Sequence, residues 1–461
     1  MLSSYYLCRY IYRLCALLTL SLSCMVGAVA EHVACAPLPA QLKVDQVWGG
    51  TKLNFGTVES SSSIYIGYYD TDRWLAVSQV NKCTGAIRKV RLNSRFTGWD
   101  AHNYVTMALD KDGLVHMSGN MHVSKLIYSR MSKLDDLESL QTLQPITGGI
   151  QDRTTYPKFF YFSDGTLGFS YRYGQSGDGV EVIDRFDGTV WERWLDKPLF
   201  ASAAGQKPVN AYHTGYILGP DGNFHVAWVW RANQNANTNV NVNYARSKDL
   251  KNWVSSDGKA LTLPITPINA EVVDPVSQGQ GLFNNIRLGF DGDARPVISY
   301  LKFDTKGSSQ LFHARREIDG WKIHQSTQWK YRWNPQGGGT IPAEISFSGL
   351  IWRDGLLLER VTHVEIGRNV TFNYEASTLS TPKVLKNFQW VDALNVKRIV
   401  APNTLLTIAG VKPADGNSVP SFAFSWIGMP ADTRDQPRVC KPEVADCQYS
   451  FDLILHKLDR Q

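Results

Sequence analysis

Long amphipathic helical patterns are scarce in this sequence, and several signals that would narrow its function are missing. No two cysteines have the CxxC spacing of a zinc ribbon, so a cysteine metal site has little support. No dense Lys/Arg run appears, and a formal net charge of +6 does not demand nucleic acid as a partner. The apolar run Leu14–Met25 is too short for a membrane span. What the chain does have is aromatic residues, which favour β-strands.

The first 30 residues follow the order of a secretory signal. Arg9 and Arg13 precede the apolar run, and small residues at 28–30 suit cleavage. We therefore predict a signal peptide at 1–30, a mature domain at 31–461, and a secreted or periplasmic protein. Four cysteines remain after cleavage, and an even number in an oxidising compartment indicates disulfides. The expected pairs are Cys35 with Cys83 and Cys440 with Cys447.

An Asp-Gly turn followed by a short apolar strand recurs at intervals of about 50 to 70 residues. Asp-Gly between two apolar runs predicts a hairpin, because Gly accepts the positive φ of a tight turn. Repeats of this length with roughly four strands each are typical of propeller blades. The turns begin at Asp112, Asp164, Asp221, Asp291, Asp354 and Asp415.

These six turns predict six blades, and Ser62–Tyr69 with Trp74–Gln79 predicts one more without Asp-Gly. The expected fold is all-β, a single-domain, seven-bladed β-propeller, with an uncertainty of one blade. The C-terminal strand Tyr449–His456 is expected to pair with the first blade and close the ring. A β-sandwich array and two β domains are the rival layouts, but no linker-like stretch separates two halves.

Blade polarity selects the candidate site. The Asp-Gly turns mark the bottom face, so residues before each first strand and after each second strand gather at the top. His102 and His122 meet there from one blade, and Tyr156 and Arg172 from the next. The blade after that contributes Tyr212, His213 and Arg231. His116 and His225 share one repeat position in the middle of a strand, which favours a structural role.

These residue types suit β-elimination from a uronic acid better than hydrolysis. Glycosidases normally need two placed carboxylates, and the top positions offer no convincing pair. Elimination needs a cation to neutralise the uronate, a base for the C5 proton and an acid for the leaving O4. Arg172 can bind a carboxylate with both arms of its fork. His102, His122 and Tyr156 can supply the base and the acid, in an order that the residues leave open.

The patterns WDAHN, DGLVHMSGNMH and LIYSR, followed by TYPKF and SYRYG, resemble the BNR-type β-propeller ulvan lyases. These form polysaccharide lyase family twenty-five, with family twenty-four as a relative. The resemblance implies cleavage of ulvan, a sulfated rhamnose–uronic acid polysaccharide, with an unsaturated uronic acid as the product. It implies catalytic roles for His102, His122, Tyr156 and Arg172, and substrate binding by Asn103, Tyr212, His213 and Arg231.

The chemistry implied by the resemblance requires no cofactor. Members of such families can carry a structural metal ion, zinc or calcium, whose ligands this sequence does not place. The expected partner is the anionic polysaccharide, with no nucleic acid and no membrane span. Two other classes stay open, a sialidase-like glycoside hydrolase and a non-catalytic carbohydrate-binding propeller.

Overall fold

Short strands joined by tight turns form nearly all of the regular structure. The computed structural model describes Cys35, 38–143, 146–149, 151–386, 388, 403–413, 420–438 and 449–458. Two 3₁₀ turns, η1 (Leu137–Ser139) and η2 (Ala236–Thr238), interrupt the strands. Within these described residues, no helix has the length and apolar character needed to cross a membrane.

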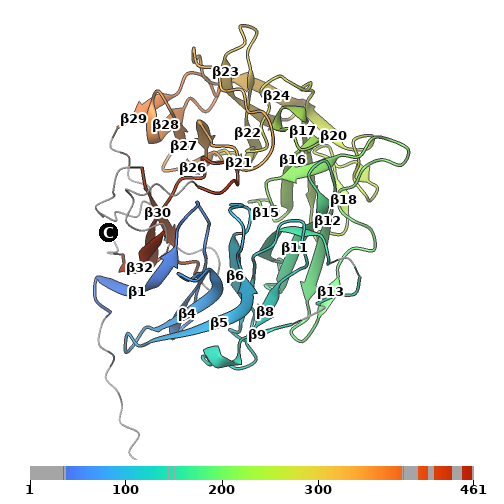
Figure 1. Ribbon diagram of the computed structural model, residues 1–461. Helices are drawn as coiled ribbons and strands as arrows, with labels where there is room; N and C mark the ends of the chain where they lie inside the picture. Colours follow the sequence, from blue (N-terminus) through green and yellow to red (C-terminus); the bar gives the residue numbers. More distant parts are fainter. Residues whose placement is uncertain are drawn as a thin grey trace, which may run out of the picture. The chain divides into compact units, whose positions relative to one another are not determined.

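Six sheets are each built from one continuous stretch of chain, and Figure 1 shows them following one another around a ring. The first contains β2 (Gly56–Glu59), β3 (Ser63–Tyr69), β4 (Trp74–Asn81) and β5 (Ile87–Arg95). The second contains β6 (Val105–Leu109), β7 (Val115–Gly119), β8 (Tyr128–Arg130) and β9 (Gln141–Thr142). The third contains β10 (Thr154–Tyr161), β11 (Leu167–Gln175), β12 (Asp178–Phe186) and β13 (Trp191–Arg193).

The remaining continuous sheets complete the larger part of the ring. The fourth contains β14 (Asn210–His213), β15 (Ile217–Leu218), β16 (Phe224–Arg231), β17 (Asn239–Ser247), β18 (Trp253–Val254), β19 (Ala260–Leu261) and β20 (Glu271–Asp274). The fifth contains β21 (Arg287–Phe290), β22 (Pro296–Phe303), β23 (Ser309–Glu317) and β24 (Gly320–Gln325). The sixth contains β25 (Ile345–Phe347), β26 (Ile351–Arg353), β27 (Leu356–His363), β28 (Gly367–Tyr374) and β29 (Lys383–Leu385).

A further four-stranded sheet joins the two ends of the described chain. It has the order β1 (Gln41–Trp48), β32 (Ser450–Lys457), β31 (Phe422–Gly428) and β30 (Leu405–Gly410). The prediction of a seven-bladed propeller is therefore wrong. Six blades are self-contained, and the remaining sheet is a composite, because the N-terminal strand β1 supplies its edge.

The mode of ring closure also differs from the prediction. β32 pairs antiparallel with β1 from Gln41 opposite His456 to Trp48 opposite Ser450, and not with the first blade. β3 and β4 pair as expected but are the second and third strands of their sheet, because β2 precedes them. The all-β propeller prediction is confirmed, and all described strands lie in the compact unit Ala36–Gln461.

Burial explains the sequence of the middle strands. Every residue of β3, SIYIGYY, and of β16, FHVAWVWR, is buried, because sheets on both sides cover these strands. Such strands have continuous apolar runs instead of alternation. The outer strand β5, IRKVRLNSR, is mostly exposed and rich in charged residues.

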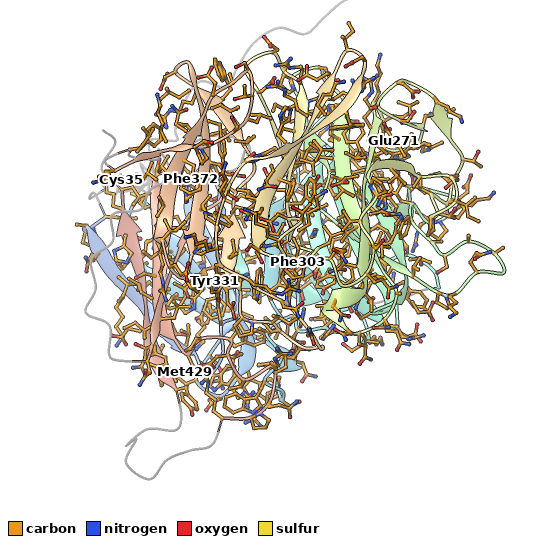
Figure 2. The ribbon with its side chains drawn as sticks, turned by 90° about the horizontal axis from the view of Figure 1, so that it is seen from above. Cys35, Glu271, Phe303, Tyr331, Phe372 and Met429 are labelled. Carbon is orange, nitrogen blue, oxygen red and sulfur yellow. The ribbon has the colours of Figure 1, made fainter. Side chains whose placement is uncertain are left out.

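Between the second and third sheets, Tyr128 packs with Phe169 and Trp191. Each fully buried large side chain of this kind contributes about 1.5–3 kcal/mol. Figure 2 labels two further buried aromatic residues, Phe303 on β22 and Phe372 on β28.

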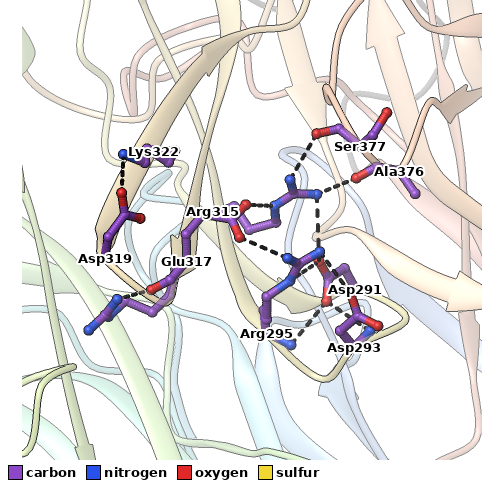
Figure 3. Close-up of polar contacts among 10 residues, drawn as sticks. Asp291, Asp293, Arg295, Arg315, Glu317, Asp319, Lys322, Ala376 and Ser377 are labelled. Atoms are coloured by element: carbon purple, nitrogen blue, oxygen red, sulfur yellow. Dashed lines mark hydrogen bonds and ion pairs between the residues drawn. The ribbon is translucent and has the colours of Figure 1, made fainter.

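The five Asp-Gly turns that lie in the described residues follow the prediction with one change of register, and the sixth, at Asp415, lies outside them. Gly113, at the first Asp-Gly turn, has a φ of +76°, as a tight hairpin turn requires. At Asp291 the residue with positive φ is Ala294 instead of Gly292, so the turn is displaced by two residues. Charge holds this turn, because Arg295 binds the carboxylates of both Asp291 and Glu317 (Figure 3).

The neighbouring sheet is tied to the same network. Arg315, on β23, lies beside Asp291 and donates to the backbone oxygen of Ser377 at 2.9 Å (Figure 3). Ser377 follows β28, so this arginine links the fifth and sixth blades.

Of the predicted disulfide cysteines, Cys35 and Cys83 are both disulfide-bonded. Cys440, Cys447 and the predicted signal peptide at 1–30 lie outside the described residues.

Candidate active site

Two histidines meet at the end of the second sheet, as blade polarity predicts. His102 lies in the loop before β6 and His122 in the loop after β7. β6 and β7 are antiparallel, with Val105 opposite Gly119, so the two loops leave the sheet at the same end. The imidazole rings stack with their centroids 4.4 Å apart. Their side chains are 22% and 26% exposed, so a ligand can reach both rings.

Asp100, which is not among the residues predicted from the sequence, holds both rings. One carboxylate oxygen of Asp100 lies 2.5 Å from Nδ1 of His102, and the other is hydrogen-bonded to Nδ1 of His122. A carboxylate only accepts, so each Nδ1 carries the hydrogen and each Nε2 is left for another partner. Burial alone would raise the pKa of Asp100. The hydrogen bonds from the two histidines outweigh it and hold that pKa well below its usual value.

Tyr156 faces the two histidines from the third sheet. Its ring centroid is 5.8 Å from that of His102 and 6.4 Å from that of His122. The β10–β11 register shifts between Thr155 and Lys158, and at this bulge Tyr156 has a φ of +57°. A non-glycine residue in this region is strained, and such strain gathers at functional sites. Burial raises the pKa of the Tyr156 phenol, with a further rise from Tyr212, so the phenol keeps its proton.

Arg172 is a buried cation whose hydrogen-bonding capacity is only partly used. It lies on β11, opposite Thr155 on β10, and its side chain passes over the Tyr156 ring at 4.8 Å from the centroid. Nη1 donates to the hydroxyl of Tyr212 at 3.4 Å. Arg172 is only 3% exposed, yet Nε and Nη2 have no hydrogen-bond partner among the described residues. Leaving such donors unpaired is costly, so the geometry favours a bound carboxylate or sulfate.

The fourth sheet supplies the wall beyond Arg172. Tyr212, on β14, stacks edge-on against Tyr156 with ring centroids 6.1 Å apart, and its hydroxyl lies 2.7 Å from Oγ of Ser176. Arg231, at the end of β16, lies over the Tyr212 ring at 5.2 Å. Its Nε donates to the backbone oxygen of Asn233 at 3.1 Å, and Nη2 binds the oxygen of Gln234. Arg231 therefore supports the loop that follows β16. Its remaining terminal nitrogen, Nη1, is not used in these two hydrogen bonds.

A groove continues from this wall across the same face. Its volume is 720 Å³, and its lining includes Ser176, Lys207, Asn233, Asn235 and Gly337. Ser176 belongs to both the groove and the contact with Tyr212, so the groove adjoins the histidine–arginine cluster. Lys207 brings a cation, Asp178 brings an acid, and the asparagines bring hydrogen-bonding amides. This composition suits an extended polar chain.

His213 lies in a separate, buried cluster. Its Nε2 is 3.1 Å from a carboxylate oxygen of Glu181, and its Nδ1 accepts from the backbone N–H of Gly215 at 3.2 Å. Tyr216 donates to the same carboxylate at 3.3 Å. Burial acts to raise the pKa of Glu181, but His213 and Lys158 outweigh it and lower that pKa. Burial lowers the pKa of Lys158. Within the described chain, the hydrogen-bond and ring partners of His213 do not include His102 or His122.

Asn103 closes the turn that carries Asp100. Its backbone N–H and its side-chain amide both donate to the Asp100 backbone oxygen, at 3.2 and 3.1 Å. Its own oxygen accepts from the Tyr69 hydroxyl at 2.6 Å. The amide predicted to bind substrate is thus used to shape the loop.

One group of described residues could be considered for a metal ion, namely Asp100, His102 and His122. A tetrahedral zinc ion with ligands at about 2.0–2.1 Å keeps those ligands roughly 3.3 Å apart. The Asp100 oxygen and the His102 Nδ1 are 2.5 Å apart, which leaves no space for an ion between them. The group therefore fits a hydrogen-bonded triad and does not fit a metal centre. A structural zinc or calcium ion elsewhere stays a prediction.

The comparisons with known proteins agree with the fold. A family model described as "BNR repeat-containing family member" matches residues 63–329, more than half of the chain. A search of curated protein sequences finds no match. Among solved structures, polysaccharide lyase Uly1 is similar with a TM-score of 0.57 and 15% identity, over 92% of this chain and 100% of that one.

Two further solved structures are similar over most of their length. An ulvan lyase of polysaccharide lyase family PL25 has a TM-score of 0.58 and 14% identity, over 84% of this chain and 93% of that one. A PL25 ulvan lyase bound to GlcA(1-4)Rha3S gives 0.57 and 13% over the same shares. At these identities the likeness establishes the propeller fold alone.

Proposed function

The chain belongs to the BNR repeat-containing family, and from this premise we propose that it is a polysaccharide lyase acting on ulvan. It would cleave the bond at O4 of a uronic acid residue by β-elimination and leave an unsaturated uronic acid end. The observation that carries the proposal is Arg172, a buried guanidinium with two unpaired nitrogens over the ring of Tyr156, which in turn faces two accessible histidines.

In the proposed reaction, Arg172 binds the uronate carboxylate. Neutralising that charge makes the adjacent C5 proton more acidic, because the electrons it leaves behind can spread into the carboxylate. The lone pair of a histidine Nε2 then takes the C5 proton. The electrons of the C5–H bond form the C4–C5 double bond, and the C4–O4 bond breaks. The Tyr156 phenol donates its proton to the departing O4.

The assignment of base and acid follows from the hydrogen bonds. Asp100 fixes Nδ1 of both histidines as donors, so the Nε2 atoms are the ones able to accept a proton. Burial raises the pKa of Tyr156, which keeps the phenol protonated at neutral pH and suits it to act as the acid. His102 and His122 are equivalent in this respect, and either can be the base.

Ulvan as the substrate is supported by the groove and by the relatives. Ulvan carries sulfate as well as carboxylate, and Lys207 in the groove together with Arg231 at its edge offers positive charge for a second anion. Two solved structures with the same fold are described as ulvan lyases, one of them bound to a glucuronate and sulfated rhamnose unit. The proposal includes export, which is supported by the signal-like pattern at 1–30.

The first experiment measures ultraviolet absorbance of the unsaturated product with purified protein and a panel of uronic-acid polysaccharides, with and without sulfate. The proposal expects absorbance to rise on ulvan. New reducing ends without absorbance would indicate a sialidase-like hydrolase. Binding without cleavage would indicate a carbohydrate-binding propeller. Either result would overturn the lyase proposal.

The second experiment compares Arg172→Ala, Arg172→Lys and His102→Ala. Removing the carboxylate-binding fork or a reacting imidazole is expected to lower kcat/KM by about 100-fold to 10,000-fold. Lys is expected to restore only part of the activity, because a point charge cannot bind both carboxylate oxygens in a fork. Arg185→Ala is the matched control, since Arg185 lies in the same sheet but pairs with Asp164 at an exposed turn. Near parental activity in Arg172→Ala or His102→Ala would refute these roles.

A further inference from the structure

A segment from the far end of the chain reaches the candidate site. We name residues 429–438, between β31 and β32, the C-terminal strap. At its start, the backbone N–H of Met429, labelled in Figure 2, donates to the oxygen of Gly49 at 2.7 Å. At its end, Nε of Arg438 donates to the oxygen of Gly50 at 2.9 Å. Both ends of the strap are therefore anchored to the turn that follows β1.

The middle of the strap contacts the histidine loop through Asp435. One carboxylate oxygen of Asp435 accepts from the backbone N–H of Ala101 at 3.2 Å. The other accepts from the backbone N–H of Thr340 at 2.7 Å and lies 3.8 Å from Nδ1 of His102. Asp435 thus holds the peptide between Asp100 and His102, the two residues that begin the reacting cluster.

The strap backbone adopts an unfavourable conformation at the residues that make this contact. Arg434 and Asp435 have φ values of +53° and +68°. Two consecutive non-glycine residues in the left-handed region are unfavourable, and such conformations persist only where surrounding contacts enforce them. The contacts are specific, because Nη1 of Arg434 donates to the backbone oxygen of Gln336 at 2.7 Å.

The loop at 336–340 carries the connection on to the groove. The backbone N–H of Gly337 donates to the side-chain oxygen of Asn235 at 2.7 Å, and its oxygen accepts from the N–H of Ala236 at 2.9 Å. Asn235 and Gly337 both line the groove. Hydrogen bonds therefore run from the histidine loop, through Asp435, to the groove beside Arg231.

We propose that Asp435 is a positioning residue for the reaction, which clamps the loop of Asp100 and His102 and links it to the groove. This inference rests on the proposed lyase function. Asp435 lies outside the segment 63–329 matched by the family model, so the composite sheet supplies part of the active site. By fixing the Ala101 peptide, the clamp sets the direction of the carboxylate and imidazole on either side of it.

The test compares Asp435→Ala and Asp435→Asn in the full-length protein on ulvan. A displacement of about 1 Å at a reacting group can cost on the order of 100-fold, so Asp435→Ala is expected to lower kcat by about 10-fold to 100-fold. KM should change by less than about threefold, since Arg172 and its contacts with Tyr156 and Tyr212 are untouched. Asn retains one accepting oxygen and should recover part of the lost kcat.

Asp432→Ala is the matched control. Asp432 is an acid of the same strap, but it pairs with Arg438 within the strap and is half exposed. It is expected to leave kcat near the parent value. Parental kcat in a folded Asp435→Ala variant would overturn the proposal. Equal losses of kcat and melting temperature in both strap variants would also overturn it, since they would indicate a purely structural strap.

A measurement without substrate separates this proposal from the lyase function. The rate at which diethyl pyrocarbonate modifies His102, followed by mass spectrometry, reports whether the loop is held. We expect Asp435→Ala to increase that rate several-fold and Asp432→Ala to leave it unchanged. If the parent protein cleaves no uronate polysaccharide, the lyase proposal fails and this rate still decides the clamp. An unchanged rate in Asp435→Ala would refute the clamp.

Discussion

His116 and His225 differ from His102 and His122 in what their ring nitrogens contact. His116 has Nε2 3.1 Å from Asp110 and Nδ1 2.7 Å from the Tyr128 hydroxyl, and it is fully buried. His225 repeats this arrangement two blades later. It has an Asp-Gly turn aspartate, Asp221, at 2.8 Å, and a tyrosine hydroxyl on the third strand of its blade at 2.5 Å.

The top pair shares a single carboxylate and is reachable. Each ring of His102 and His122 gives Nδ1 to Asp100, and within the described chain neither Nε2 has a hydrogen-bond partner. An acid–histidine bond therefore does not identify a reacting histidine. What distinguishes the top pair is a second nitrogen left for a ligand, together with a cation beside it. In the bottom pair the protein uses both nitrogens, and the bond stabilises the blade.

The largest expected effect comes from breaking the shared carboxylate with Asp100→Asn. The amide of Asn has one accepting oxygen, which can serve only one Nδ1–H. Its NH₂ is a donor and would face the second Nδ1–H, also a donor. One of the two rings must therefore change its tautomer or turn away. We expect kcat to fall by about 100-fold or more with little change in melting temperature, because the site is partly exposed. The measurement is the initial rate of unsaturated product beside thermal unfolding.

Asp110→Asn is the counterpart in the buried group. It removes the charge from a carboxylate that serves His116 and Arg130. It should lower the free energy of unfolding by about 1–3 kcal/mol and leave kcat of the folded enzyme within about threefold. If Asp100→Asn lost stability and kept its rate, the distinction between the two regions would be wrong.

The sequence was sufficient to predict the histidine cluster but not what holds it. Blade polarity brought His102 and His122 together from two loops, and the shared repeat position separated His116 and His225 from them. Asp100 was missed because it reads as a loop residue two positions before His102. Its role depends on how closely the two loops approach, which strand periodicity does not determine. The left-handed backbone of Tyr156 also has no sequence signal, since tyrosine normally avoids it.

Contacts between residues far apart in the chain were the other feature that could not be predicted from the sequence. β1 was not predicted, although Leu42, Val44 and Val47 fall among polar residues in a pattern that a strand at a sheet edge can have. Without β1, the C-terminal strand was assigned to the wrong sheet. Asp435 could not be found from its neighbours, because its partners Ala101 and Thr340 are far away along the chain. Pairing over such separations is a property of the closed ring and not of any local motif.

A smaller effect is expected from removing a buried ring. His116→Ala leaves a cavity, removes the partner of the Tyr128 hydroxyl, and removes one of the partners of the Asp110 carboxylate, which keeps Arg130. We expect a loss of about 2–4 kcal/mol in the free energy of unfolding, measured by urea denaturation, with the kcat of the folded fraction near the parent value. His102→Ala is the paired variant and should shift stability by less than about 1 kcal/mol, because its ring is partly exposed. Equal losses in the two variants would contradict the comparison.

The smallest effect concerns pH. Burial lowers the pKa of both His116 and His225 from the ordinary 6.5, although Asp110 and Asp221 oppose the shift. The folded state then binds fewer protons than the unfolded chain just below pH 6.5, so the stability that these rings contribute is present above that pH and is lost as pH falls through the folded-state pKa. Urea unfolding at pH 7.5 and pH 5 should show this loss in the parent. His225→Gln keeps hydrogen-bonding groups but does not titrate, so its loss between the two pH values should be smaller. A pH dependence identical to that of the parent would mean that His225 takes up its proton without unfolding, and the bottom pair would then be open to solvent as the top pair is.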